Sequence, residues 1–180
     1  MKKIILFVLT LGLLTGCSFN DMMNTPTKRV EELLGKYQSL DKKLVGQLDE
    51  VVSNEPTFNE THKKDYKDVI KKQYQNLTYK IKNETVDGNK ATVEVQIEVV
   101  DLISEVDKAN KYTMEHEKEF MGTDNKVSTE KVNDYKIKQL KDAKVKIKYT
   151  ITFDVTKTDK TWKVADLNET QRQKLQGMYK

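Results

Sequence analysis

The stretch "LTYKIKNETVDGNKATVEVQIEVV" at residues 77–100 decides the fold class of this chain. In both of its halves apolar side chains alternate with polar ones, which is the pattern of a β-strand with one buried face. The segment "DGNK" at residues 87–90 separates the halves, and Gly and Asn accept the positive φ angles of a tight hairpin turn. Residues 77–100 therefore predict an antiparallel β-hairpin.

A second hairpin is predicted near the end of the chain. Apolar residues alternate with Lys, Thr and Asp over residues 145–155, and the alternation resumes at Trp162 after a turn at residues 157–160. The outer face of strand 91–100 is acidic, whereas that of strand 145–155 carries lysines. Because opposite charges on facing strands attract, we expect these two strands to be neighbours in a sheet of about four strands.

The residues before the first hairpin show a helical period. Apolar side chains recur at every third or fourth position over residues 30–51, on one face of a helix. Thr25 is a preferred N-cap, and Pro26 is favoured at the first helical position. A bend or break is expected at residues 38–41.

A further helix is predicted over residues 60–74. Two residues compete for its N-terminal cap. Thr57 has the capping-box spacing to Glu60, and Asn59 is a good cap by itself.

The segment between the two hairpins is a predicted helical insert at residues 103–143. It has two helical patterns separated by the loop "GTDNK" at residues 122–126. A short terminal helix is expected from the cap Asn168 to Gly177. Helices beside an antiparallel sheet make an α+β domain, with N-terminal helices packed on a curved sheet and the insert between the hairpins.

The first twenty residues, "MKKIILFVLTLGLLTGCSFN", have the organisation of a secretory signal peptide. A basic start precedes an apolar run at residues 4–14 and then small residues. The run is shorter than the roughly 20 residues that a membrane-spanning helix needs. Its end, Leu14-Thr15-Gly16-Cys17, resembles a bacterial lipobox, in which the Cys thiol receives a diacylglycerol and the preceding peptide is removed.

The lipobox predicts the organisation of the whole chain. Residues 1–16 are the expected signal peptide, cleaved between Gly16 and Cys17, and residues 17–24 are the lipidated tether. Residues 25–180 form one domain, whose length suits a single core. The expected location is the outer face of the bacterial cytoplasmic membrane, to which lipid on Cys17 binds the protein.

Composition excludes several kinds of site. Cys17 is the only Cys among 180 residues, so the domain has neither a disulfide nor a Cys-based metal site. The formal net charge is +4, but the lysines are spread along the chain without a block of five like charges. No nucleic-acid partner and no cofactor are predicted.

No catalytic motif is present, and no catalytic residue is predicted. His62 is a possible base, but it stands in the first turn of a polar helix. His116 with Glu115 and Glu119 could be drawn as metal ligands. Neighbouring helix residues point in different directions, so we predict no metal site there.

Aromatic residues are the remaining candidates for a binding site. Their spacing fits core packing as well as a ligand-lined cavity, and a buried tyrosine needs a hydrogen-bond partner in either case. The possible pocket-lining residues are Tyr37, Tyr66, Tyr79, Tyr149 and Trp162.

Four segments carry a resemblance that covers most of the chain after Cys17: "NTPTKRVEELLGKYQSLD", "YKDVIKKQYQNLTYKIKNETVDGNKATVEVQIEV", "DYKIKQLKDAKVKIKYTITFDVTKTDKTWKVADL" and "RQKLQGMY". With the lipobox, the chain resembles a family of Gram-positive surface lipoproteins of uncharacterised function with a nuclear transport factor 2-like or cystatin-like domain. The resemblance implies a curved sheet wrapped around a long helix, which forms a cone with an opening. The insert at residues 103–143 would cap its mouth or form a partner surface.

The expected function is that of a lipid-anchored extracytoplasmic binding or interaction module without enzymatic activity. Its partner would be a protein, a wall polymer or a small ligand. Two alternatives remain open at this point. One is an enzyme that uses a carboxylate in the cone pocket, and the other is a passive accessory subunit of a surface complex.

Overall fold

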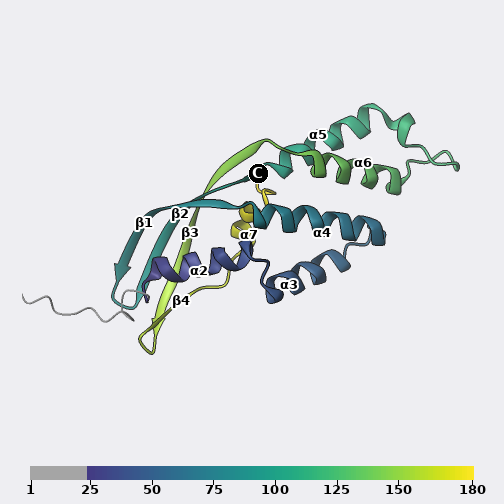
Figure 1. The fold of residues 1–180 in the computed structure, drawn as a ribbon. Helices are drawn as coiled ribbons and strands as arrows, with labels where there is room; N and C mark the ends of the chain where they lie inside the picture. Colours follow the sequence, from purple (N-terminus) through teal and green to yellow (C-terminus); the bar gives the residue numbers. More distant parts are fainter. Residues whose placement is uncertain (1–23) are drawn as a thin grey trace, which may run out of the picture.

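A computed structural model describes residues 24–180 of the chain (Figure 1). The signal peptide at residues 1–16, the lipidation site Cys17 and the tether up to residue 23 lie outside the described residues. The elements follow in the order α2 (Pro26–Gln38), α3 (Lys42–Ser53), α4 (Glu60–Gln75), β1 (Thr78–Asp87), β2 (Lys90–Val100), α5 (Leu102–Glu115), the 3-10 helix η1 (Glu117–Phe120), α6 (Thr129–Asp142), β3 (Lys146–Thr158), β4 (Thr161–Val164) and α7 (Glu169–Gln176). The α+β prediction is confirmed.

The four strands form one antiparallel sheet in the order β1-β2-β3-β4. Two tight turns close the hairpins, with Asp87 opposite Lys90 in the first and Thr158 opposite Thr161 in the second. Gly88 has a φ of +57° in the first turn, which explains the glycine of the "DGNK" signal. Both predicted hairpins are therefore confirmed.

The predicted charge pairing between the central strands is also confirmed. Glu98 on β2 lies 3.0 Å from the ammonium of Lys146 and 3.6 Å from that of Lys148, both on β3. The hydrogen bond from Lys146 lowers the pKa of the Glu98 carboxyl, with a smaller contribution from Lys148.

The break expected in the first helical pattern separates α2 from α3. Leu40 adopts a left-handed conformation with a φ of +56°, which turns the chain between the two helices. Asp41 then caps α3 by accepting a hydrogen bond from the backbone N–H of Lys43 at 3.0 Å.

Helix α2 packs on one face of the sheet and contacts all four strands (Figure 1). The central side chains between them have no exposed surface. These are Val30, Leu34, Val93, Val95 and Phe153. The core of the domain therefore lies between α2 and the sheet.

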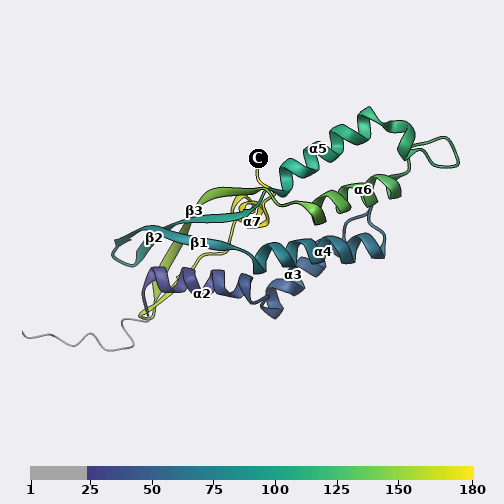
Figure 2. The ribbon, with the colours of Figure 1, turned by 45° about the horizontal axis from the view of Figure 1, so that its top comes forward.

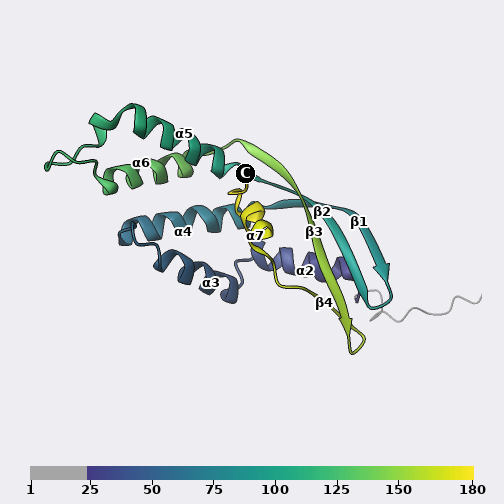
Figure 3. The same cartoon turned by 180° about the vertical axis from the view of Figure 1, so that it is seen from behind.

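The predicted insert is a helical hairpin, which we call the arm (residues 102–142). It leaves the sheet at the end of β2, returns at the start of β3, and projects beyond the sheet (Figures 1 and 2). Its α6 lies beside α4, and α4 lies beside α3 (Figure 3). In the part of the chain that the structure describes, no helix is both long and apolar enough to cross a bilayer.

The C-terminal helix fixes the base of the arm. Asn168 and Gln171 form the expected capping box of α7. At its other end Gly177 has a φ of +69°, and its backbone lies against the Val100 carbonyl and the Gln73 side chain. Gln73 is 4% exposed; its amide donates hydrogen bonds to the carbonyls of Val100 and Gln176 and accepts one from the Val100 N–H.

Candidate functional site

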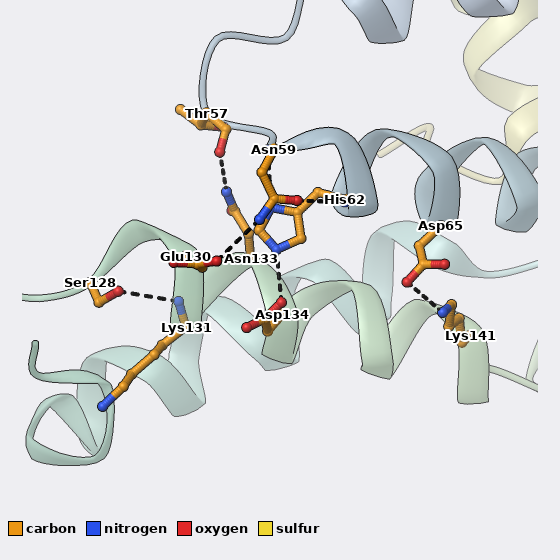
Figure 4. A network of polar contacts seen from close by, with 10 residues as sticks. All are labelled: Thr57, Asn59, His62, Asp65, Ser128, Glu130, Lys131, Asn133, Asp134 and Lys141. Atoms are coloured by element: carbon orange, nitrogen blue, oxygen red, sulfur yellow. Dashed lines mark hydrogen bonds and ion pairs between the residues drawn. The ribbon is translucent and has the colours of Figure 1, made fainter.

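A buried histidine joins the arm to α4 (Figure 4). His62 is 2% exposed, although its sequence neighbours suggested a solvated helix start. Its Nδ1 accepts the backbone N–H of Asn59, which assigns the proton to Nε2. Nε2 then donates to Asp134 Oδ1 of α6 at 2.8 Å. Because both ring nitrogens are engaged, the imidazole has no free nitrogen with which to act as a base on a substrate.

The same contacts decide between the two predicted caps of α4. Asn59 is the N-cap: its side chain accepts the His62 N–H at 2.8 Å, with the His62 ring closing the capping box. The capping box expected of Thr57 and Glu60 is wrong, and the Thr57 hydroxyl instead donates to Glu55. His62 takes the third helical position, where a ring nitrogen replaces the usual carboxylate or amide.

Two further hydrogen bonds connect the start of α4 with α6 (Figure 4). The Asn133 amide, buried on α6, donates to the Thr57 carbonyl at 2.7 Å. The Asn59 amide donates to Glu130 at 3.2 Å. The arm is thus held to α4 by polar contacts at this end, and such contacts require specific geometry.

An ion pair links the other end of α6 to α4. Lys141 lies 2.7 Å from Asp65, and this hydrogen bond lowers the pKa of the Asp65 carboxyl. Both side chains are partly exposed, so the pair itself contributes little to stability.

Between these polar contacts lies a cavity of about 350 Å³, which we call the Tyr66 cavity. Its walls come from α3, the segment between α3 and α4, α4, the arm and the C-terminal segment, and most of them are apolar. The apolar lining residues are Val51, Val52, Phe58, Val106, Ile137, Leu140 and Met178. The polar lining residues are Glu55, Thr57, Tyr66, Asn133 and Lys136.

Tyr66 is the most distinctive of the polar lining residues. Its ring packs edge-on against Phe58, with centroids 5.6 Å apart, while its hydroxyl makes no hydrogen bond with a residue of 24–180. Burial, and less strongly Tyr74 and Glu55, raises the pKa of Tyr66, so the hydroxyl is neutral at neutral pH. It can therefore donate and accept a hydrogen bond.

The five predicted pocket-lining residues do not converge on one pocket. Tyr66 lines the cavity just described, whereas Tyr37 lines a separate one of about 510 Å³ near the α2–α3 corner. Tyr149 donates to the Tyr179 carbonyl at 2.8 Å. Trp162 is 6% exposed, and the ammonium of Lys157 lies 5.5 Å from its ring centroid.

Tyr79 is half-buried on the edge strand β1 and packs against the core. Burial, with a smaller contribution from Glu31, raises the pKa of Tyr79. Its position fits the core-packing alternative that the sequence left open.

The residues around His116 stack on and hydrogen-bond with one another. His116 ends α5 and stacks on Tyr112 with ring centroids 4.0 Å apart, and the Tyr112 hydroxyl donates to Glu119 at 3.0 Å. Among residues 24–180, no group of three or more His, Cys, Asp or Glu side chains is arranged to hold a metal ion.

Sequence reasoning missed His62 and Asn133 as parts of this site. The available signal was Asn59 as a helix cap, since a cap three residues before His62 directs the ring back toward the chain entering α4.

Comparisons with known protein families, characterised proteins and solved structures found no match to this chain.

Proposed function

We propose that this protein is a lipid-anchored, non-enzymatic binding module on the outer face of a bacterial cytoplasmic membrane, and that the Tyr66 cavity receives its ligand. The lipobox that ends at Cys17 supports the anchor. The unpartnered Tyr66 hydroxyl inside a mostly apolar cavity supports the ligand site and is the observation that carries the proposal.

The lining of the cavity defines the kind of ligand. Small-molecule sites measure roughly 300–1,000 Å³ and combine apolar walls with a few placed polar groups, which describes this cavity. Besides Tyr66, Lys136 provides a polar group with no carboxylate within ion-pair distance in residues 24–180. The ligand is a small molecule with an apolar body and a hydrogen-bonding group.

An enzyme that uses a carboxylate is less well supported. Such a mechanism calls for a buried carboxyl group with a raised pKa beside a pocket. No Asp or Glu of the described chain is buried, and the carboxyl pKa shifts of Asp65 and Glu98 are downward. A passive accessory subunit would have no use for the polar side chains that line the cavity, such as Tyr66 and Lys136.

An environment-sensitive dye tests the ligand site. We expect the full chain in detergent to bind anilinonaphthalene sulfonate saturably, with a fluorescence increase and one site per chain. Val106→Phe fills the cavity and should abolish this signal, whereas Val86→Phe on the exposed part of β1 should not. Equal dye binding by the two variants would contradict the assignment.

Metabolic labelling with palmitate tests the anchor. The Cys17→Ser variant should lose the label and the membrane association, because it removes the sulfur to which the lipid is attached. Labelling of this variant at the level of the unmodified chain would refute lipidation at Cys17.

A further inference from the structure

The cavity beside Tyr37 has a different character from the Tyr66 cavity. It measures about 510 Å³ and opens where the α2–α3 corner meets the chain between β4 and α7. Helix α2 contributes Lys36 and Tyr37, α3 contributes Lys43 and Gln47, and α7 contributes Arg172. Three separate segments thus bring polar side chains to one opening.

Tyr37 is an unpartnered polar group at this cavity. Its side chain is 6% exposed, and its ring packs edge-on against Tyr74 with centroids 4.9 Å apart. The hydroxyl makes no hydrogen bond with a described residue, and its oxygen keeps some contact with solvent. Burial raises the pKa of Tyr37 to about 12, so the hydroxyl stays protonated. Buried tyrosines normally make a hydrogen bond through this group, so Tyr37 brings to the cavity lining a hydroxyl without a partner among the described residues.

Three cations line the same opening. Lys36 and Lys43 have no carboxylate within ion-pair distance in the described part of the chain. Arg172 donates to the Leu167 carbonyl and lies 3.4 Å from Glu169, so part of its guanidinium is already used. Its charge also acts on Tyr37, since it opposes the rise of that pKa.

Two carboxylates belong to the lining as well. Asp41 is engaged as the cap of α3, where it accepts the Lys43 N–H. Asp166 is exposed at the rim. The lining therefore carries one more positive than negative charge. The ammonium groups of Lys36 and Lys43 and the carboxylate of Asp166 take part in no ion pair in the described part of the chain.

From these contacts we infer that the Tyr37 cavity is a second ligand site, which binds the anionic group of a small polar molecule. The group is a carboxylate or a phosphate, since both accept hydrogen bonds from ammonium and hydroxyl donors. Lys36 and Lys43 supply the charge, and Tyr37 donates a hydrogen bond. This site shares no lining residue with the Tyr66 cavity and does not depend on it.

The test is a titration of the full chain in detergent with inorganic phosphate and, separately, with citrate, at constant ionic strength. Amide chemical shifts of the α2–α3 corner should move saturably with at least one of the two anions. Saturation by phosphate alone or by citrate alone assigns the anionic group. If neither anion saturates these shifts, the inference is wrong.

Substitutions separate this site from unspecific charge effects. Lys43→Gln should weaken binding about tenfold, the loss expected for one charge-assisted hydrogen bond. Tyr37→Phe should weaken it as well, while Lys42→Gln, an exposed neighbour outside the lining, should not. Tyr66→Phe should leave anion binding unchanged. Equal losses in Lys42→Gln and Lys43→Gln would show that only overall charge matters and would overturn the site.

Discussion

Replacing Asp134 by Ala tests how the arm is attached to α4. The substitution removes the acceptor of the His62 Nε2–H, which lies 2.8 Å from the carboxylate in a ring that is 2% exposed. A buried donor left without a partner costs about 1–3 kcal/mol. The Asp134 side chain is 63% exposed, so water can partly replace it. We therefore expect a loss of about 1–2 kcal/mol in the free energy of unfolding.

Urea denaturation followed by circular dichroism measures this loss, provided that the denaturant slope does not change. Asp68→Ala is the matched control, because Asp68 pairs with Lys64 at 3.0 Å on the surface of α4, where both partners are exposed. That substitution should cost no more than about 0.5 kcal/mol. Asp134→Asn keeps an acceptor oxygen and should retain most of the stability.

A double-mutant cycle with His62→Ala then isolates the pair. A coupling of about 1 kcal/mol between His62 and Asp134 is expected, since the two side chains are in direct contact. The reasoning is refuted if Asp134→Ala is no more destabilising than Asp68→Ala, or if the cycle shows no coupling.

Four other substitutions probe the helices, the core and the Tyr37 cavity. Gly177→Ala should prevent stable folding as measured by thermal denaturation, because the added Cβ would overlap the Val100 carbonyl and the residue has a φ of +69°. Gly46→Ala is its control. Gly46 has open space around it in α3, so this substitution should be neutral or stabilise the fold by up to about 1 kcal/mol. Gln73→Leu should cost about 2–4 kcal/mol in urea denaturation, since it leaves the Val100 N–H and carbonyl without their partner. Tyr37 has a folded pKa of about 12 against 10.0 when unfolded, so its contribution is present below pH 10 and is lost as the pH rises toward 12. Denaturation at pH 9 and pH 12 should show a stability loss that is smaller by about 2 kcal/mol in Tyr37→Phe; an equal loss in both proteins would contradict it.

The fold was predictable because its signals are local. The "DGNK" turn, the alternation along both hairpins and the break near Leu40 each depend on a few consecutive residues. The neighbouring position of β2 and β3 followed from the charges of their outer faces, which the structure joins through Glu98 and Lys146.

The site was less predictable, since it depends on contacts between residues far apart in the chain. His62 and Asp134 are separated by 72 positions, and nothing in the sequence near either residue indicates the other. Tyr66 lines a cavity because α3 and α6 both pack against α4, and this packing cannot be read from the spacing of the aromatic residues. Their spacing left both Tyr66 and Tyr149 as possible pocket-lining residues, whereas in the structure Tyr149 donates a hydrogen bond to the C-terminal segment.

The two ends of the sheet have different neighbours, which bears on the proposed anchor. Asn24, where the described chain starts, bonds to Lys160 and Trp162 at the turn between β3 and β4 (Figure 1). The arm joins the opposite end of β3, whose thirteen residues span about 40 Å at the usual rise of a strand. A lipid on Cys17 would thus attach the protein at the hairpin end, while the Tyr66 cavity lies at the arm end.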